Sequence, residues 1–333
     1  MTGIIPAEWS PHRAMWVGWP SHADLWEENL EPAQAEVEAL VRALVGPGRE
    51  QVQLMVGHPD ALADARTRFA DVDGVEIIDG RFGDIWLRDT GPIFGARSER
   101  AAAFRFNGWG GKYELEHDDT VADQIGEASG TALDRNDFIL EGGALDHDGE
   151  GVILTTRQCL LNRNRNADWT EAKAEAALSA SLGATKVLWL GDGLFNDHTD
   201  GHVDNLARFV APGVVACPVA WGGKDPNAEV YDETARLLSA MTDASGRPLK
   251  VLRVPSPGLV LDADERPAPA SHMNFLIANG AVIVPAYGDE AAARMAVKAL
   301  ETVFTDREVI ALPSIAILSG GGSFHCISQQ EPA

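Results

Sequence analysis

The stretch SFHCISQQ at residues 323–330, near the end of the chain, has no partner strand close to it in the sequence. The stretch AMWVGWP at residues 14–20, near the beginning, is an apolar run that is typical of a buried strand. We expect these two segments to pair with each other. A strand borrowed from the other terminus suggests a closed ring of repeated units, which leaves few sheet edges exposed.

Outward from this pair, one order of elements recurs along the chain: a hairpin, an amphipathic helix and a strand. Hairpins are expected at residues 88–107, 136–156, 202–220 and 271–287, helices at 115–129, 169–182, 228–241 and 290–304, and closing strands at 186–190, 249–254 and 308–313. A fifth unit combines residues 14–20, a helix at 32–44, a strand at 51–56 and the C-terminal stretch. Sequence identity between the copies is negligible, so an open doubly wound sheet is the alternative.

Composition indicates a soluble globular protein and restricts its partners. The chain has 333 residues, of which 45% are hydrophobic, and 50 acidic against 27 basic residues give a formal net charge of −23. Such a surface disfavours nucleic acid and anionic membranes and favours a small cationic substrate, although the charge could serve solubility alone. Three cysteines without close pairing, no signal-peptide pattern and no apolar run of about 20 residues predict a cytoplasmic protein.

Each copy carries one polar residue beside or within the apolar run of its first strand. In chain order these residues are Asp89, Glu141, His202, Asn274 and Cys326. Equivalent positions of a pseudo-symmetric ring converge on its central axis. We therefore predict that two acids, a histidine, an amide and a thiol share one pocket.

Cys326 is the predicted nucleophile of this pocket. It follows three glycines at residues 320–322, which permit a sharp turn and close approach of the backbone to a ligand. A thiol gains reactivity as its thiolate, which needs nearby positive charge or hydrogen-bond donors. Cys159 and Cys217 lie in apolar runs and are predicted to be core residues.

His202 is the predicted general acid and base. Asp204 lies two residues further on, so in a strand both side chains share a face and the carboxylate can orient the imidazole. A capped turn is one alternative, and a metal site formed with His198 is another, although residues 199–201 favour a turn. His325 is expected on the strand face opposite to Cys326, in a structural role.

Asp89 and Glu141 predict a cationic ligand, because two buried carboxylates in one pocket are costly without a positive partner. A planar guanidinium matches carboxylates in a bidentate manner and stacks on aromatic rings. The alternative for Asp89 is an internal ion pair with its neighbour Arg88.

These residues lie in motifs that resemble the agmatine deiminases of the bacterial peptidyl-arginine deiminase-type family of guanidine-modifying enzymes. The motifs are PAEWSPHRAMWVGWP (6–20), DIWLRDTGP (84–92), FRFNGWGGKY (104–113), LEGGALDHDGEG (140–151), CLLNRNRN (159–166), DGHVDN (200–205), NFLIANG (274–280) and GGGSFHCISQQEP (320–332). The resemblance implies an α/β fold, a five-bladed pseudo-symmetric α/β-propeller of ββαβ repeats closed by the terminal strands. It also implies a single domain over residues 1–333.

The resemblance implies a catalytic role for five residues. Cys326 would attack the guanidinium carbon, and His202 would protonate the leaving ammonia and later activate water. Asp89, Glu141 and Asp204 would bind the guanidinium and orient His202.

Three further residues, Trp86, Asn274 and Trp109, would bind the substrate by the same resemblance. The sequence departs from the usual family pattern at two places near the pocket. Residues 323–324 are Ser-Phe instead of Asn-Ile, and His272 replaces a common tyrosine.

The implied reaction is hydrolysis of agmatine to N-carbamoylputrescine and ammonia through a covalent thiouronium intermediate, without metal or cofactor. The alternatives are deimination of peptidyl or free arginine, transfer of the amidino group to an amine, and binding of guanidines or polyamines without catalysis. The resemblance leaves a homodimer open.

Overall fold

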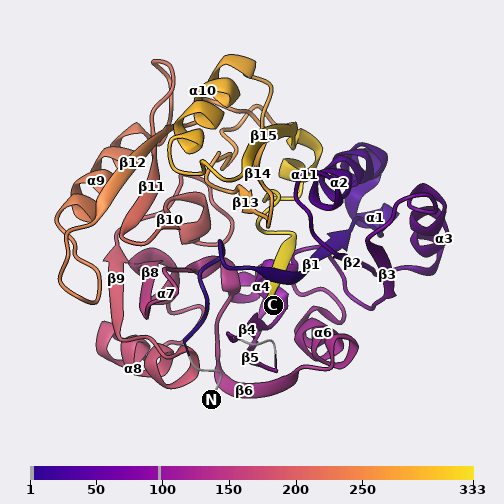
Figure 1. Cartoon of the computed structure of the whole chain (residues 1–333), viewed down its shortest axis with the longest axis horizontal. Helices are drawn as coiled ribbons and strands as arrows, with labels where there is room; N and C mark the ends of the chain where they lie inside the picture. The colour runs from indigo at the N-terminus through magenta and orange to yellow at the C-terminus, as the bar shows by residue number, and fades with distance from the viewer. Residues whose placement is uncertain (1–3, 97–98) are drawn as a thin grey trace.

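The computed structural model describes residues 4–96 and 99–333 and shows a mixed α/β fold with five separate sheets. Figure 1 shows these sheets set around the middle of the molecule, with most of the longer helices on the outside. The C-terminal strand lies near the centre of this view.

The terminal sheet joins the two ends of the chain, as predicted. Strand β16 (Ser328–Pro332) pairs antiparallel with β1 (His12–Trp19), and β1 pairs parallel with β2 (Val52–Val56), which pairs with β3 (Val75–Asp79). The helices of this unit are α1 (Ala23–Trp26), η1 (Glu27–Asn29), α2 (Leu30–Val45), α3 (Pro59–Arg68) and α11 (Ile315–Ser319). The pairing of β16 with β1 places the C-terminal strand beside the N-terminal one (Figure 1).

Each of the other four sheets has three strands, of which the first two are antiparallel and the last two parallel. The first two sheets are β4 (Ile93–Phe94), β5 (Arg100–Arg105) and β6 (Ala132–Ile139), then β7 (Leu145–His147), β8 (Val152–Thr156) and β9 (Lys186–Leu190). The next two are β10 (Arg208–Ala211), β11 (Val214–Val219) and β12 (Lys250–Pro255), then β13 (Leu276–Ile277), β14 (Ala281–Ala286) and β15 (Glu308–Pro313).

A helix connects the two parallel strands in each of these units. The connecting helices are α6 (Val121–Ser129), α8 (Glu171–Leu182), α9 (Ala228–Ser239) and α10 (Glu290–Glu301), and the shorter helices are α4 (Leu87–Thr90), α5 (Gly108–Gly111), η2 (Asp118–Thr120), η3 (Gly142–Ala144), α7 (Arg157–Leu160) and η4 (Val203–Asn205). Helix α10 illustrates the local causes, because Asp289 caps its first turn by accepting from the amides of Ala291 and Ala292. Its buried face, with Ala296 and Leu300, joins the core cluster of the last sheet.

The predicted order of hairpin, helix and strand is confirmed, with two corrections to its boundaries. Residues 136–139 belong to β6, the last strand of one unit, rather than to the following hairpin. The first strands are also much shorter than predicted: residues 202–207, 271–275 and 323–327 precede strands instead of forming them. In the third unit, for example, residues 203–205 form the 3-10 turn η4, and the ladder starts only at Arg208.

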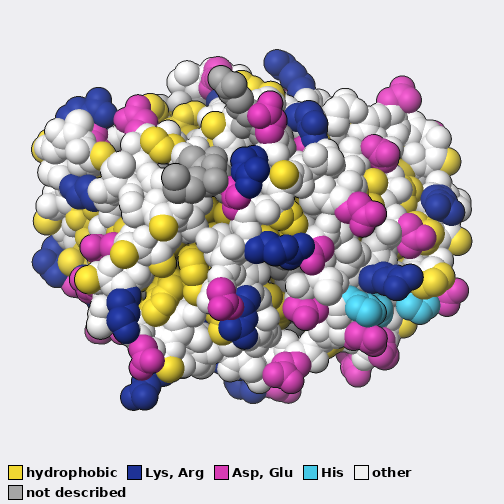
Figure 2. Space-filling view, turned by 90° about the horizontal axis from the view of Figure 1, so that it is seen from below, with side chains coloured by type: hydrophobic (Ala, Val, Ile, Leu, Met, Phe, Trp, Pro, Cys, Tyr) yellow, Lys and Arg dark blue, Asp and Glu magenta, His cyan; other side chains and the backbone are white. Residues whose placement is uncertain are grey.

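The surface carries both signs of charge. Figure 2 shows Lys and Arg side chains scattered among Asp and Glu on one face of the molecule. Within residues 4–96 and 99–333, no helix has the length and apolar character needed to cross a membrane.

Candidate active site

The five predicted pocket residues all lie in the turns that lead into first strands. Asp89 lies in α4, Glu141 directly before η3 and His202 directly before η4, whereas Asn274 and Cys326 each lie two residues before a strand. The prediction that they lie in the strands themselves was wrong. Their equivalent placement in the five units was correct.

Glycine at position 143 allows these turns to approach one another. A Cβ atom there would lie 2.6 Å from Nδ1 of His202 and 2.8 Å from Oδ1 of Asp89, closer than side chains can pack. The amide of Gly143 donates to Oδ1 of Asp89 at 2.9 Å. The glycine therefore permits the contact between units and also binds one of the carboxylates.

The structure brings the thiol, the amide and one acid into direct contact. The side-chain amide of Asn274 donates to Sγ of Cys326 at 3.0 Å, and Oδ2 of Asp204 lies 3.5 Å from the same sulfur. Oδ1 of Asn274 accepts from the backbone amide of His325 at 3.0 Å. Asn274 thus fixes both the sulfur and the backbone of the turn that carries it.

A cavity of about 290 Å³ opens onto this group of residues. Trp86, Asp89, Trp109 and Cys326 line it, as predicted for a substrate site. The other predicted residues lie behind this lining and are buried: Glu141, His202, Asp204 and Asn274.

Asp89 has no cationic partner within hydrogen-bonding distance among the described residues, and the predicted alternative of an ion pair with Arg88 is wrong. Instead, the indole of Trp109 donates to Oδ2 of Asp89 at 2.9 Å. Arg88 points away and donates to Gln329 and Gln330. Burial raises the pKa of Asp89 well above its usual value, and the nearby acids Asp204 and Glu141 raise it further.

Glu141 already has a cationic partner, which the sequence did not predict. Nε of Arg165 donates to Oε1 of Glu141 at 2.7 Å, and both side chains are 1% exposed. Arg165 also pairs with Asp200 and donates to the carbonyl of Thr199, in the loop that leads to His202. Burial still raises the pKa of Glu141, although Arg165 opposes the shift.

His202 lies within the protein with both ring nitrogens free of hydrogen bonds to the described residues. Its Nδ1 is 3.6 Å from Oδ1 of Asp89. Burial lowers the pKa of His202 to about 3, although the charge of Asp204 opposes the shift, so the empty pocket holds a neutral imidazole. A neutral imidazole can accept a proton, as a general base must.

Asp204 does not orient His202 by a hydrogen bond, which corrects the prediction. His202 directly precedes the 3-10 turn η4 and Asp204 lies within it, so the two residues do not share a strand face. Oδ2 of Asp204 instead bonds Nδ1 of His325 at 2.8 Å. His325, predicted on the opposite side, therefore reaches the site. Burial would raise the pKa of Asp204, but the hydrogen bond and charge of His325, together with the charges of His202 and Arg208, outweigh burial and hold the pKa below its usual value.

The surroundings of Cys326 disfavour its thiolate form. Burial raises the pKa of Cys326 well above its usual value, and the charges of Asp204 and Asp89 raise it further. The donor from Asn274 opposes this shift without reversing it. Formation of the thiolate therefore requires additional positive charge in the cavity.

The tryptophans form an aromatic wall of the cavity. The indoles of Trp26 and Trp86 both donate to Asp84, at 3.1 and 2.6 Å, and burial raises the pKa of Asp84 to about 6. A Cβ atom on Gly322 would lie 2.6 Å from the ring of Trp86, which explains the glycine at this position. Trp109 adopts a left-handed backbone conformation, with φ +53°, between glycines.

One group of three potential metal ligands occurs in the described part of the chain: Glu141, Cys159 and His202, all buried. The predicted alternative set with His198 does not form such a group, since Nδ1 of His198 lies 2.8 Å from the hydroxyl of Tyr113. Arg165 already binds Glu141, and burial raises the pKa of Cys159 well above its usual value. Both features disfavour a cation at this position.

The departures from the family pattern lie outside the cavity lining. Ser323 shares a hydrogen bond of 2.6 Å with Ser314, and Phe324 is fully buried. His272 bonds the carbonyl of Pro255 at 2.7 Å and stacks on Tyr287. These residues form the packing behind the site.

Comparison with known proteins gives a consistent match over the chain. Residues 4–332 match the family model of the Porphyromonas-type peptidyl-arginine deiminases. An agmatine deiminase of Stutzerimonas stutzeri is 38% identical, with 99% of this chain and 95% of the relative covered.

Solved structures agree with this match. The agmatine deiminase of Enterococcus faecalis superposes with a TM-score of 0.92 at 33% identity, with 99% of this chain and 96% of that one covered. A cysteine-to-serine variant of C. jejuni agmatine deiminase with substrate bound gives a TM-score of 0.87 at 29% identity, with 100% and 97% covered.

Proposed function

Because the chain belongs to the Porphyromonas-type peptidyl-arginine deiminase family, we infer that it hydrolyses agmatine to N-carbamoylputrescine and ammonia. One observation supports this inference most strongly. The thiol of Cys326 lies beside a cavity whose carboxylate, Asp89, has no cationic partner within hydrogen-bonding distance among the described residues. A guanidinium supplies the missing charge.

The substrate cation binds between carboxylates and indoles. Asp89 lines the cavity, and Oδ1 of Asp204 is buried without a hydrogen-bond partner in the described part of the chain. Both can accept from guanidinium N–H groups, and the rings of Trp86 and Trp109 offer flat faces for stacking. Glu141, which is paired with Arg165 behind the cavity lining, also attracts the guanidinium.

Binding of the cation activates the nucleophile. A positive charge in the cavity lowers the pKa values of Asp89 and Cys326, which burial has raised. The thiol proton passes to neutral His202, and the thiolate attacks the guanidinium carbon. Asn274 stabilises the sulfur by its donor to Sγ.

The covalent adduct then resolves in two steps. Protonated His202 gives its proton to the leaving nitrogen, ammonia departs, and a cationic S-alkylthiouronium remains on Cys326. His202, neutral again, takes a proton from water, whose oxygen attacks the same carbon. The C–S bond breaks, the thiolate regains the proton, and the substituted urea leaves.

The cavity lining favours agmatine over free arginine. The described residues that line it include Glu27 and Asp84, but no lysine or arginine. An α-carboxylate would therefore meet no fixed positive partner, whereas the primary ammonium of agmatine meets acidic groups. Peptidyl arginine and amidino transfer remain the alternatives.

The five sheets and the β1–β16 pairing support the proposal that the chain forms a five-bladed α/β-propeller closed by its terminal strands. We also propose that residues 1–333 form one domain; residues 1–3 and 97–98 of this range lie outside the described part. The three free cysteines agree with a reducing compartment, and we propose the cytoplasm as the location of the protein. A homodimer stays a prediction.

Ammonia release from agmatine, free arginine and an arginyl peptide, with no amine acceptor present, tests the proposal. We expect release from agmatine at the highest kcat/KM. Release only from the arginyl peptide would move the assignment to peptidyl arginine. If none of the three substrates released ammonia but the amidino group were transferred once an amine was added, the protein would be an amidinotransferase and not a hydrolase.

A further inference from the structure

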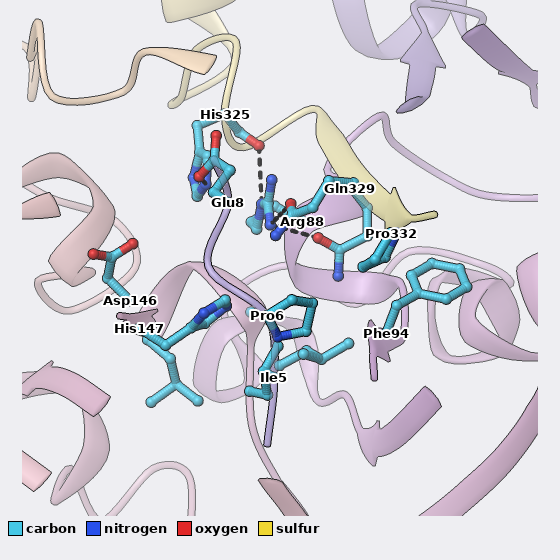
Figure 3. A pocket seen from close by; sticks show the side chains of 14 residues that line it. Ile5, Pro6, Glu8, Arg88, Phe94, Asp146, His147, His325, Gln329 and Pro332 are labelled. Carbon is cyan, nitrogen blue, oxygen red and sulfur yellow. Dashed lines mark hydrogen bonds and ion pairs between the residues drawn. The ribbon is translucent and has the colours of Figure 1, made fainter. Parts of the chain in front are cut away.

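Residues 323–327, which carry Cys326 and which we call the catalytic turn, have a buried polar network on the side that faces away from the cavity. It consists of Glu8, Asp146, Arg208 and His325, which we call the supporting network. Figure 3 shows Glu8 and His325 side by side, with Arg88 between His325 and Gln329. All four members of the network are less than 9% exposed.

The ring of His325 connects this network to the proposed site. Its Nδ1 lies 2.8 Å from Oδ2 of Asp204, and its Nε2 lies 3.3 Å from Oε2 of Glu8. Glu8 is itself fixed, because it pairs with Arg208 and accepts from the amide of Ile277 at 2.8 Å. Both ring nitrogens therefore face a carboxylate oxygen, and the hydrogen bond to Asp204 is the shorter of the two contacts.

The contact with His325 makes the two carboxylate oxygens of Asp204 different from each other. Oδ2 accepts a hydrogen bond from Nδ1 of His325. It also lies 3.5 Å from the sulfur of Cys326 and 3.4 Å from the side-chain amide of Asn274. Oδ1 has no hydrogen-bond partner in the described part of the chain. A carboxylate that can rotate freely would not keep one oxygen available in this way.

We propose that His325 is a positioning residue for the deimination reaction: it holds Asp204 by Oδ2 and thereby keeps Oδ1 available to the substrate guanidinium. This inference rests on the proposed function, since it takes Asp204 as a substrate-binding carboxylate. His325 itself touches neither substrate nor the reacting atoms. Its effect passes through Asp204.

Two polar replacements separate this role from simple packing. Asparagine places its amide nitrogen near the position of Nδ1 and can still donate to Asp204, whereas glutamine extends its amide toward the position of Nε2 and Glu8. We expect His325→Gln to lower kcat/KM for agmatine by roughly tenfold to a hundredfold, as for loss of a hydrogen bond to a charged group. His325→Asn should stay within about threefold of the wild-type value.

A double-mutant cycle with Asp204→Asn shows whether His325 acts through Asp204. In the Asp204→Asn background, His325→Gln should change kcat/KM by less than about threefold. Leu178→Ala, in the buried face of α8 and remote from the cavity, is the control for lost stability. Leu178→Ala should lower the melting temperature and leave kcat/KM unchanged.

Agmatine binding supplies a second readout. In protein with Cys326→Ser, which does not turn over, His325→Gln should weaken the Kd of agmatine by the same factor as kcat/KM. Equal losses for His325→Asn and His325→Gln, or full additivity with Asp204→Asn, would overturn the positioning role. Wild-type activity of Asp204→Asn would overturn the proposed substrate role of Asp204, and the positioning role with it.

Discussion

The two sides of the catalytic turn differ in how their charges are paired. On the inner side, the supporting network joins Glu8 and Asp146 to Arg208, and each carboxylate has a cation at hydrogen-bonding distance. On the cavity side, the hydrogen bonds that Asp89 accepts from side chains and amides of the described residues come from the indole of Trp109 and the amide of Gly143. A buried charge without a counter-ion is unfavourable in free energy, so the cavity side destabilises the fold until a bound cation offsets this cost.

Paired and unpaired buried carboxylates have different roles in this molecule. A carboxylate that is paired within the protein stabilises the fold, while an unpaired one reserves its interaction for a ligand. The pKa values follow this division only in part. Burial raises the pKa of Asp89, and at Glu8 the charges of Arg208 and His325 outweigh burial and hold the pKa well below its usual value. Asp146 is paired with Arg208, yet burial still raises its pKa to about 6.

The largest expected effect is on the nucleophile. Cys326→Ser should lower kcat by several orders of magnitude without loss of the fold, because a hydroxyl has a far higher pKa than a thiol. Steady-state ammonia release and circular dichroism would measure the two properties. Cys159→Ser and Cys217→Ser are the matched controls, and both should keep the chemistry. Near-wild-type turnover of Cys326→Ser would refute covalent catalysis by this residue.

The next effect is on the unpaired carboxylate of the cavity. Asp89→Asn should lower kcat/KM for agmatine by roughly a hundredfold to several thousandfold, since loss of one partner from a buried charge pair costs about 3–5 kcal/mol. Asp137→Asn is the control, because the side chain of Asp137 is 95% exposed. A loss of less than tenfold for Asp89→Asn would mean that the guanidinium binds elsewhere.

The paired side should show the opposite behaviour. Asp146→Asn removes one partner of the buried Arg208 and should lower the free energy of unfolding by about 3–5 kcal/mol. Its kcat/KM should change by less than about threefold, because Asp146 does not line the cavity. Urea unfolding and steady-state kinetics on the same preparation would test this contrast. Unchanged stability together with lost activity would reverse the assignment of the two sides.

The smallest expected effect is that of metal removal. Exhaustive chelation should leave kcat/KM unchanged, since proton transfer by His202 and attack by Cys326 suffice for both half-reactions. Assays before and after treatment with a chelator, and after addition of zinc, would check this. Loss of activity on chelation that zinc restores would indicate a metal at Glu141, Cys159 and His202.

Much of the fold could be predicted because its signals are local. Apolar runs, turn residues such as Asn279-Gly280 and the apolar face of each helix depend on neighbouring residues. The pairing of the chain ends could be predicted because the C-terminal segment had no partner strand near it in the sequence. The alternation in HVDN was misleading, since a turn at Gly201, with φ +87°, directs residues 203–205 into a 3-10 helix.

The convergence of the site could be predicted from the repeat, but the partners of its residues could not. Arg165 reaches Glu141 from a separate segment, and His325 reaches Asp204 across 121 positions of sequence. The run NRNRN at residues 162–166 contained a signal, because polar residues directly after a buried segment can turn inward. Nothing in the sequence distinguishes Arg165 from Arg163 in this run.

Calorimetry of agmatine binding to Cys326→Ser protein tests the central claim, that the cavity side lacks a cation which the substrate supplies. Burial and the neighbouring acids raise the pKa of Asp89, so a bound cation must lower it and release protons at pH values between the two pKa values. Binding heats in buffers of different ionisation enthalpy measure this release. We predict net release at pH values above the ordinary pKa of an aspartate, strongly reduced by a further Asp89→Asn change, which also weakens Kd. Equal Kd and no proton release in both proteins would contradict the account.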